Sequence, residues 1–177
     1  MKKVSSIFFL LLLASATLYS CNKNAERTGN AYFSVKMTDA PGDYDSVNVE
    51  VVGTEIHYSN GGWTSLPTVT GIYNLLDLQN DVTAVLVDPN IVPAGDIQQM
   101  RLILGAQNTV VVDSVSYPLA LSSQDKTGLK INVNTSVYAG DSVEILIDFD
   151  ADQSIVEQGN GTYRLKPVVK LENVTFF

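Results

Sequence analysis

Apolar and polar residues alternate along most of the chain after residue 30. The clearest case is the segment 46–58, in which Val47, Val49 and Val51 alternate with polar side chains. Side chains two residues apart point to the same face of a β-strand, so this pattern predicts a strand with one buried face. The same period, or a short apolar run, predicts further strands over 31–38, 97–104, 109–112, 115–119, 130–133, 143–150 and 163–174.

Turn signals separate these segments. Asn60-Gly61-Gly62 follows the strand at 46–58, and Pro167 interrupts the last predicted strand, which places that strand at an edge or a bulge. The segment 75–87 is ambiguous between a helical turn and a strand that meets a loop, and no stretch keeps a helical period over three turns. We therefore predict an all-β fold, a single antiparallel β-sandwich of immunoglobulin-like or transthyretin-like type.

The start of the chain follows a different pattern. Two lysines precede an uninterrupted apolar run over 7–14, and a short segment that ends in Ser20 leads into Cys21, the single cysteine. A basic start, a short apolar core and a small residue before the cut are typical of a secretory signal peptide. A transmembrane helix needs ~20 apolar residues, so this run is too short to span a bilayer. The Leu-x-Ser-Cys pattern at 18–21 resembles the lipobox of bacterial lipoproteins, in which the cysteine becomes the acylated N-terminus.

The sequence therefore divides into three predicted parts. Residues 1–20 form a lipoprotein signal peptide, residues 21–30 comprise the lipidated Cys21 and a flexible, disordered linker, and residues 31–177 form the β-sandwich domain. Nine residues span at most about 30 Å, so acyl chains on Cys21 would hold the domain close to a membrane. Asn22 stands where an aspartate marks inner-membrane retention in some Gram-negative bacteria, which favours the outer membrane and leaves the leaflet open.

Charge and residue types narrow the class of function. The chain has 11 Lys and Arg against 19 Asp and Glu residues, a formal net charge of −8, and removing the signal with its two lysines makes this −10. The balance argues against nucleic acid, whose phosphates are bound by Lys and Arg. His57 is the single histidine and Cys21 the single cysteine, so neither a nucleophile–histidine pair nor a zinc site is evident. We therefore predict that the protein is not an enzyme.

Two groups of aspartates form the candidate ligand or cation site. One group surrounds a Pro-Gly turn, and the other alternates at the end of the strand at 143–150. If the two lie close together, one expectation is a Ca²⁺ site, because Ca²⁺ takes six to eight oxygen ligands. The others are solvated carboxylates that cap turns and a carboxylate-dependent glycosidase. The positions are Asp39, Asp43 and Asp45 in the first group and Asp148, Asp150 and Asp152 in the second.

Aromatic residues are a second kind of candidate. Trp63 follows a glycine turn and is the candidate aromatic contact for a ligand, because a ring at such a place is expected to be partly exposed. Aromatic side chains are also ordinary strand formers and core fillers. The tyrosines considered as sugar platforms beside it are Tyr58, Tyr73, Tyr117, Tyr138 and Tyr163.

Several short segments, taken in their order along the chain, resemble the DUF4382 family of bacterial and archaeal extracellular domains. The resemblance covers about residues 31–175 and implies a secreted, usually lipid-anchored β-sandwich module, here on a bacterial lipoprotein of the Bacteroidetes type. The family has no established reaction, so no catalytic residues carry over. Among the segments are Thr38-Asp39-Ala40-Pro41, Gly62-Trp63, Pro93-Ala94-Gly95, Arg101-Leu102, Gly128-Leu129-Lys130, Asp148-Phe149-Asp150-Ala151 and Leu165-Lys166-Pro167.

The expected function is that of a non-catalytic binding or structural module of the cell envelope, attached to the membrane by acyl chains and taking a glycan or a protein ligand. The alternative is a carboxylate-dependent hydrolase of envelope glycans. The two differ in geometry, because a glycosidase needs two carboxyl groups roughly 5–9.5 Å apart in a cleft.

Overall fold

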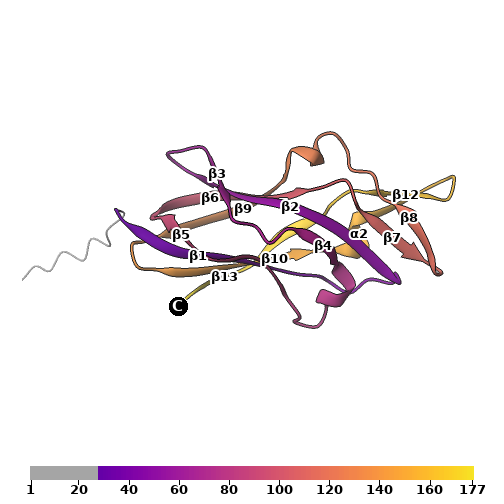
Figure 1. Ribbon diagram of the computed structural model, residues 1–177, viewed down its shortest axis with the longest axis horizontal. Helices are drawn as coiled ribbons and strands as arrows, with labels where there is room; N and C mark the ends of the chain where they lie inside the picture. The colour runs from indigo at the N-terminus through magenta and orange to yellow at the C-terminus, as the bar shows by residue number, and fades with distance from the viewer. Residues whose placement is uncertain (1–27) are drawn as a thin grey trace, which may run out of the picture.

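The computed structural model describes residues 28–177, so the predicted signal segment and Cys21 lie outside the described residues. Figure 1 shows that the strands are arranged in two layers. The strands are β1 (Asn30–Thr38), β2 (Ser46–Tyr58), β3 (Trp63–Leu66), β4 (Gly71–Asn74), β5 (Ala84–Pro93), β6 (Gly95–Leu104), β7 (Thr109–Val112), β8 (Val115–Pro118), β9 (Leu129–Val137), β10 (Ser142–Phe149), β11 (Ile155–Gln158), β12 (Thr162–Leu165) and β13 (Val169–Phe176). The short helices are the 3-10 turns η1 (Leu75–Leu78) and η2 (Asp125–Thr127) and the α-helix α2 (Ala151–Ser154).

The smaller of the two main sheets has the strand order β13-β10-β1-β5. β1 is parallel to β10, with Tyr32 opposite Ser142 and Thr38 opposite Asp148, and the other pairs are antiparallel. The predicted all-antiparallel arrangement therefore does not hold for this pair. Parallel neighbours need a long connection, and here the strands of the larger sheet lie between β1 and β10 in the sequence.

The larger sheet is built around the long strand β2. Its path is β8-β7-β2-β6-β9, with β3 and β4 also paired to β2. A register shift between Val51 and Gly53 reverses which side chains of β2 face the core. Val49 and Val51 are buried before the shift, and Ile56 is buried after it. The alternation in the sequence predicted which residues of β2 are buried before the shift. The bulge changes the parity, so that even-numbered residues such as Ile56 face the core after it.

A single hydrophobic core joins the two sheets. It takes alternate residues from β1 and β10 on one side, such as Phe33 and Phe149, and from β2 and β6 on the other, such as Ile56 and Met100, and all four are fully buried. The prediction of an all-β fold is thereby confirmed. Among residues 28–177, no helix is long and apolar enough to cross a bilayer.

Two sequence segments fold differently from the prediction. The ambiguous segment 75–87 contains both alternatives, since η1 is followed by the start of β5. The last predicted strand, 163–174, is two strands: β12 pairs with β11, whereas β13 pairs with β10. Pro167 lies between them, where no ladder hydrogen bond is required of its nitrogen.

Candidate functional site

Two of the six predicted aspartates lie side by side in the smaller sheet. Asp148 is the last residue but one of β10, and Asp39 directly follows Thr38, which is opposite Asp148 in β1. Each residue is only 5 % exposed. Asp39 Oδ1 accepts a hydrogen bond from the Ala151 N–H at 2.8 Å, and Asp148 Oδ2 forms an ion pair with Lys170 Nζ at 2.9 Å. The structure thus brings one residue of each acidic group together, which was the condition for the Ca²⁺ expectation.

The environments of these carboxyl groups differ. Burial raises the pKa of Asp39 from 3.8 to about 6, although the Ala151 N–H and the Gln79 side chain act in the opposite direction. The negative charges of Asp148 and Asp150 raise it further. Lys170 neutralises Asp148 from the edge strand β13, and this hydrogen bond raises the pKa of the Lys170 ammonium. The pair thus combines a carboxyl that titrates near neutrality with one held against a cation.

The other four aspartates do not join this pair in one cluster. Asp150 caps α2 by accepting the Gln153 N–H at 2.9 Å, and Asp45 accepts the Ser114 N–H at 2.7 Å. Asp43 and Asp152 are exposed. Across residues 28–177, no group of three or more His, Cys, Asp or Glu side chains is arranged to hold a metal ion. The geometry therefore adds nothing to the Ca²⁺ expectation.

A hollow of about 540 Å³ lies against Asp39 and Asp148. Lys170 also lines it, together with Asn80 and Asp81 from the turn after η1. Asp39 Oδ2 and Asp148 Oδ1 are buried and accept no hydrogen bond of normal geometry. These two oxygens are inaccessible to solvent. A ligand in the hollow would therefore reach them only after a shift of the chain.

The residues around this pair connect three segments that are distant in sequence. Thr38 Oγ1 donates to the Leu78 carbonyl at 2.8 Å, which fixes η1 against the end of β1. Ser154, fully buried, receives the Val168 N–H on its hydroxyl at 2.9 Å. The segments that resemble the DUF4382 pattern at 38–41, 148–151 and 165–167 therefore meet here as structural partners. We refer to this region, Thr38–Asp39 with Asp148–Ser154 and Lys170, as the acidic junction.

Trp63, the predicted aromatic contact, lies on the outer face of the larger sheet. The guanidinium of Arg101 stacks over its ring at 4.4 Å from the centroid, and the His57 ring meets it edge-on at 5.1 Å. Glu55 binds Arg101 through Nε at 2.6 Å. The indole is only half-exposed as a result, and one face of its ring is already occupied by a cation.

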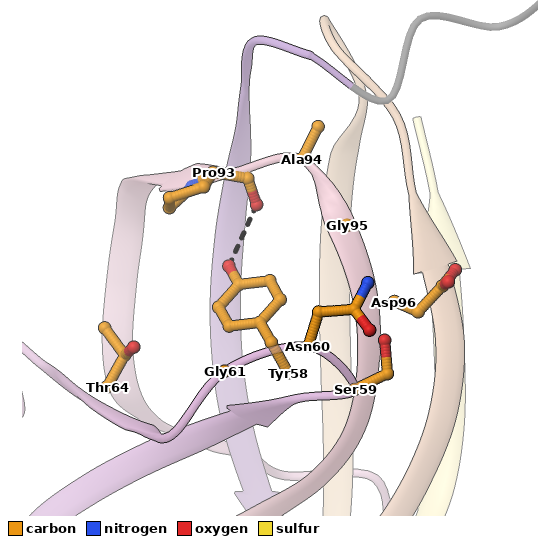
Figure 2. A pocket seen from close by; sticks show the side chains of 9 residues that line it. All are labelled: Tyr58, Ser59, Asn60, Gly61, Thr64, Pro93, Ala94, Gly95 and Asp96. Carbon is orange, nitrogen blue, oxygen red and sulfur yellow. Dashed lines mark hydrogen bonds between the residues drawn. The ribbon is translucent and has the colours of Figure 1, made fainter.

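A second hollow, of about 390 Å³, lies where the β2–β3 turn meets the β5–β6 turn. Ser59 N–H donates to the Asp96 carbonyl at 2.9 Å and so joins the two turns. Figure 2 shows the Tyr58 ring at the centre, with Ser59 and Asn60 on one side and Thr64 on the other. We call this site, lined by residues 58–61, Thr64 and residues 93–96, the hairpin hollow.

The Tyr58 ring is held at both its end and its side. Its hydroxyl donates to the Pro93 carbonyl at 2.9 Å. Burial raises the pKa of the Tyr58 hydroxyl further above neutrality, so the group is a protonated donor at neutral pH. A Cβ built on Gly95 would lie 3.1 Å from Tyr58 Cδ1, so the ring packs directly against the glycine backbone. An aromatic ring fixed in this way offers a preformed surface to a ligand.

Polar groups surround the ring at short range. Asn60 and Ser59 are exposed on the β2–β3 turn, and Thr64 is exposed at the start of β3. Asp96 accepts a hydrogen bond from the Ser136 hydroxyl at 2.6 Å, which orients its carboxylate. Donors and acceptors of this kind around an aromatic surface suit a ligand that carries several hydroxyl groups.

Sequence reasoning named the parts of the hairpin hollow without joining them. Tyr58 is one of several candidate aromatic residues in the sequence, and Pro93-Ala94-Gly95 is named there only as a segment of the family resemblance. The signal that could have joined them is the pairing of the strands: β2 runs into one turn and β6 leaves the other, so an antiparallel β2–β6 pair places both turns at the same end.

The comparisons with known proteins point to a family rather than to an activity. The profile of the family described as "Domain of unknown function (DUF4382)" matches residues 30–167. No curated protein and no solved structure matches the chain. The matched range contains both the acidic junction, apart from Lys170, and the whole hairpin hollow.

Proposed function

Since the chain belongs to the DUF4382 family of domains of unknown function, we propose that it is a non-catalytic binding module and that its ligand is a glycan of the cell envelope. The Leu-x-Ser-Cys pattern at 18–21 supports a second part of the proposal, in which acyl chains on Cys21 attach the protein to the outer membrane. The two-layer arrangement supports a β-sandwich of immunoglobulin-like or transthyretin-like type, a class whose end loops commonly carry binding.

The observation that carries the proposal is the fixed ring of Tyr58 in the hairpin hollow. Its hydroxyl is bound to Pro93 and one side is packed on Gly95, so little conformational freedom is lost when a ligand stacks on it. Sugar rings present C–H groups on their faces and hydroxyl groups at their rims. The Tyr58 ring would stack against the face of a sugar. Asn60 and Thr64 would form hydrogen bonds with the hydroxyl groups at its rim.

The test begins with the full-length Cys21→Ser chain on an array of envelope glycan fragments. Titration of the strongest binder then compares Tyr58→Ala with the unchanged site. Removing the ring should weaken binding by at least about fivefold, because aromatic contacts contribute on the order of 1 kcal/mol beyond their area. Trp63→Ala is the matched control, since Trp63 belongs to the neighbouring strand but lies outside the hollow.

Three results would contradict the proposal in different ways. If Trp63→Ala removed binding and Tyr58→Ala did not, the outer face of the larger sheet would be the site. If no glycan bound, a protein ligand or a structural role would replace the glycan. If the glycan were cleaved on incubation, the module would be catalytic.

The acidic junction supports one alternative, a carboxylate-dependent hydrolase of envelope glycans. A carboxyl whose pKa is raised to about 6, beside a second carboxyl group, is the combination that glycosidases use. For such an enzyme, Asp39→Asn and Asp148→Asn should each abolish the release of reducing ends, whereas Asp43→Asn, on the exposed turn, should not. Unchanged release in the first two variants would rule out this alternative.

A further inference from the structure

A row of exposed apolar side chains crosses the outer face of the smaller sheet. Tyr32 on β1 is 52 % exposed and Ile91 on β5 is 58 % exposed, and the two are directly opposite each other. On the other side of Tyr32 lies the small Ser142 of β10. Next to Ser142 is Phe177, 79 % exposed, whose N–H donates to the Ser142 carbonyl at 3.0 Å. We call Tyr32, Ile91 and Phe177 the apolar row.

The apolar row lies at the end of the domain where the described chain begins. Figure 1 shows that β1 enters the sheet from this end. Gly29 and Asn30 are held here, because their carbonyls accept the N–H groups of Ala94 and Gly140 at 2.8 and 2.9 Å. Tyr32 is two residues from Asn30, which is roughly 7 Å along the strand.

Charged side chains on the same face begin farther from this end. Lys36 Nζ and Glu144 Oε2 form an ion pair at 2.9 Å. Lys36 is four residues beyond Tyr32 along β1, and Glu144 is two residues beyond Ser142 along β10. Asp148 and Lys170 follow at the far end of the sheet. The outer face is therefore apolar near the start of β1 and charged beyond it, a distribution that matches the change from hydrocarbon to headgroups and water at a membrane surface.

We propose that the apolar row docks on the surface of the lipid bilayer, so that the domain lies with this corner against the membrane instead of moving freely about its linker. The proposal rests on the lipid anchor at Cys21. Eight residues, 22–29, lie between Cys21 and the start of β1 and span at most about 29 Å, which brings the row within reach of the bilayer.

Size and chemistry favour a lipid surface over a second copy of the chain. Three large side chains exposed to this extent present on the order of 350 Å², within the range of functional surface patches. A stable protein interface buries about 800 Å² per partner. Tyr32 also combines an apolar ring with a polar hydroxyl, as residues at the membrane interface do. Because the chain is acidic, the surface it suits is zwitterionic rather than anionic.

The experiment places a fluorescent reporter in the row of the acylated full-length protein. Trp63→Phe removes the single tryptophan, and Tyr32→Trp restores one in the row. The protein is reconstituted on phosphatidylcholine vesicles whose acyl chains carry bromine, which quenches tryptophan fluorescence on contact. We expect clear quenching of this reporter, and none for the matched reporter Tyr117→Trp, since Tyr117 lies on β8 at the opposite end of the molecule (Figure 1).

A second pair of variants tests whether the row itself makes the contact. Ile91→Asp in the Tyr32→Trp background should reduce quenching at least about threefold, because a charge inserted in the row opposes contact with acyl chains. Val115→Asp should leave it unchanged, since Val115 is similarly exposed, at 50 %, but lies on β8.

Co-sedimentation with the vesicles separates the two proposals. A protein that sediments with the vesicles while its Tyr32→Trp reporter stays unquenched would overturn the docking and leave the anchor intact. A protein that does not sediment, or a Cys21→Ser chain that sediments equally well, would overturn the anchor at Cys21 and with it the docking as proposed.

Discussion

The acidic junction and the hairpin hollow use their polar groups in opposite ways. In the acidic junction, the side chains accept hydrogen bonds from backbone N–H groups of the same chain, as Asp39, Asp150 and Ser154 do. In the hairpin hollow, Asn60 and Thr64 are exposed around a ring that the backbone holds in place. The aspartates of the acidic junction therefore contribute mainly to contacts that hold the fold together. The ligand site that we propose lies instead between two turns that contain no cluster of charged residues.

Replacing Asp39 by a neutral residue tests whether the acidic junction contributes to the stability of the fold. Among the predictions, it has the largest expected effect on the free energy of unfolding. Burial raises the pKa of this carboxyl from 3.8 to about 6, so the folded state binds its proton more tightly than the unfolded state does. Wild-type stability should therefore fall as the pH rises from about 4 to about 6, by at most about 3 kcal/mol. Asp39→Asn keeps the acceptor for Ala151, removes this loss, and should be more stable at pH 8 by denaturant unfolding.

The control for Asp39 is Asp43→Asn, because Asp43 is exposed and its replacement should leave the pH profile nearly unchanged. An Asp39→Asn protein that is less stable than wild type at pH 8 would contradict the prediction. It would mean that contacts of the ionised carboxylate outweigh the cost of its burial.

Replacing Gly95 by alanine tests the hollow by displacing its ring. The new Cβ would lie 3.1 Å from Tyr58 Cδ1 and force the ring to move by a few tenths of an ångström. We expect glycan binding to weaken by up to about tenfold, or roughly 1.4 kcal/mol, with little change in the melting temperature. Gly62→Ala is the matched control, because its Cβ would meet nothing within 4 Å and Gly62 does not line the hollow. Equal weakening by both variants would argue against a fixed ring as the source of affinity.

Removing the cap of α2 has the smallest expected effect. Asp150→Ala deletes the acceptor of the Gln153 N–H and should lower the free energy of unfolding by about 1 kcal/mol. Asp152→Ala, at an exposed position of the same helix, should change it by less than about 0.5 kcal/mol. Both are measured by urea unfolding. If Asp150→Ala lowered glycan affinity without lowering stability, the acidic junction would be a binding site after all.

The sequence predicted those parts of the fold that depend on local patterns. Alternation located β1, β2, β6 and β10, because each buries one face in the common core. It left the start of β5 ambiguous and did not predict the rest of the strand, because Asp88, Pro89 and Asn90 are residues typical of loops. β5 tolerates them because it is an edge strand with a register shift opposite Phe33 and Val35. The parallel pairing of β1 with β10 could not be predicted either, because the sequence pattern of a strand does not indicate which strand it pairs with.

The candidate site was predicted in part for the same reason. Period-two spacing placed Asp148 and Asp150 at one strand end, and the turn at 40–42 brought Asp39 beside them. Spacing could not show that Asp150 would cap a helix or that Asp39 would hold the Ala151 N–H. The position of Trp63 after a turn was predicted, but the stacking of Arg101 on its ring depends on the register of β6 against β2.

The placement of β1 between β10 and β5 also determines how the domain would bear mechanical load. A protein held by its N-terminus is pulled at Asn30, along the axis of β1. Both neighbouring ladders lie parallel to that direction, so their hydrogen bonds would have to break together in shear instead of opening one at a time like a zipper. If the protein is anchored through Cys21 as proposed, drag on the domain would act on β1 and load both of its ladders.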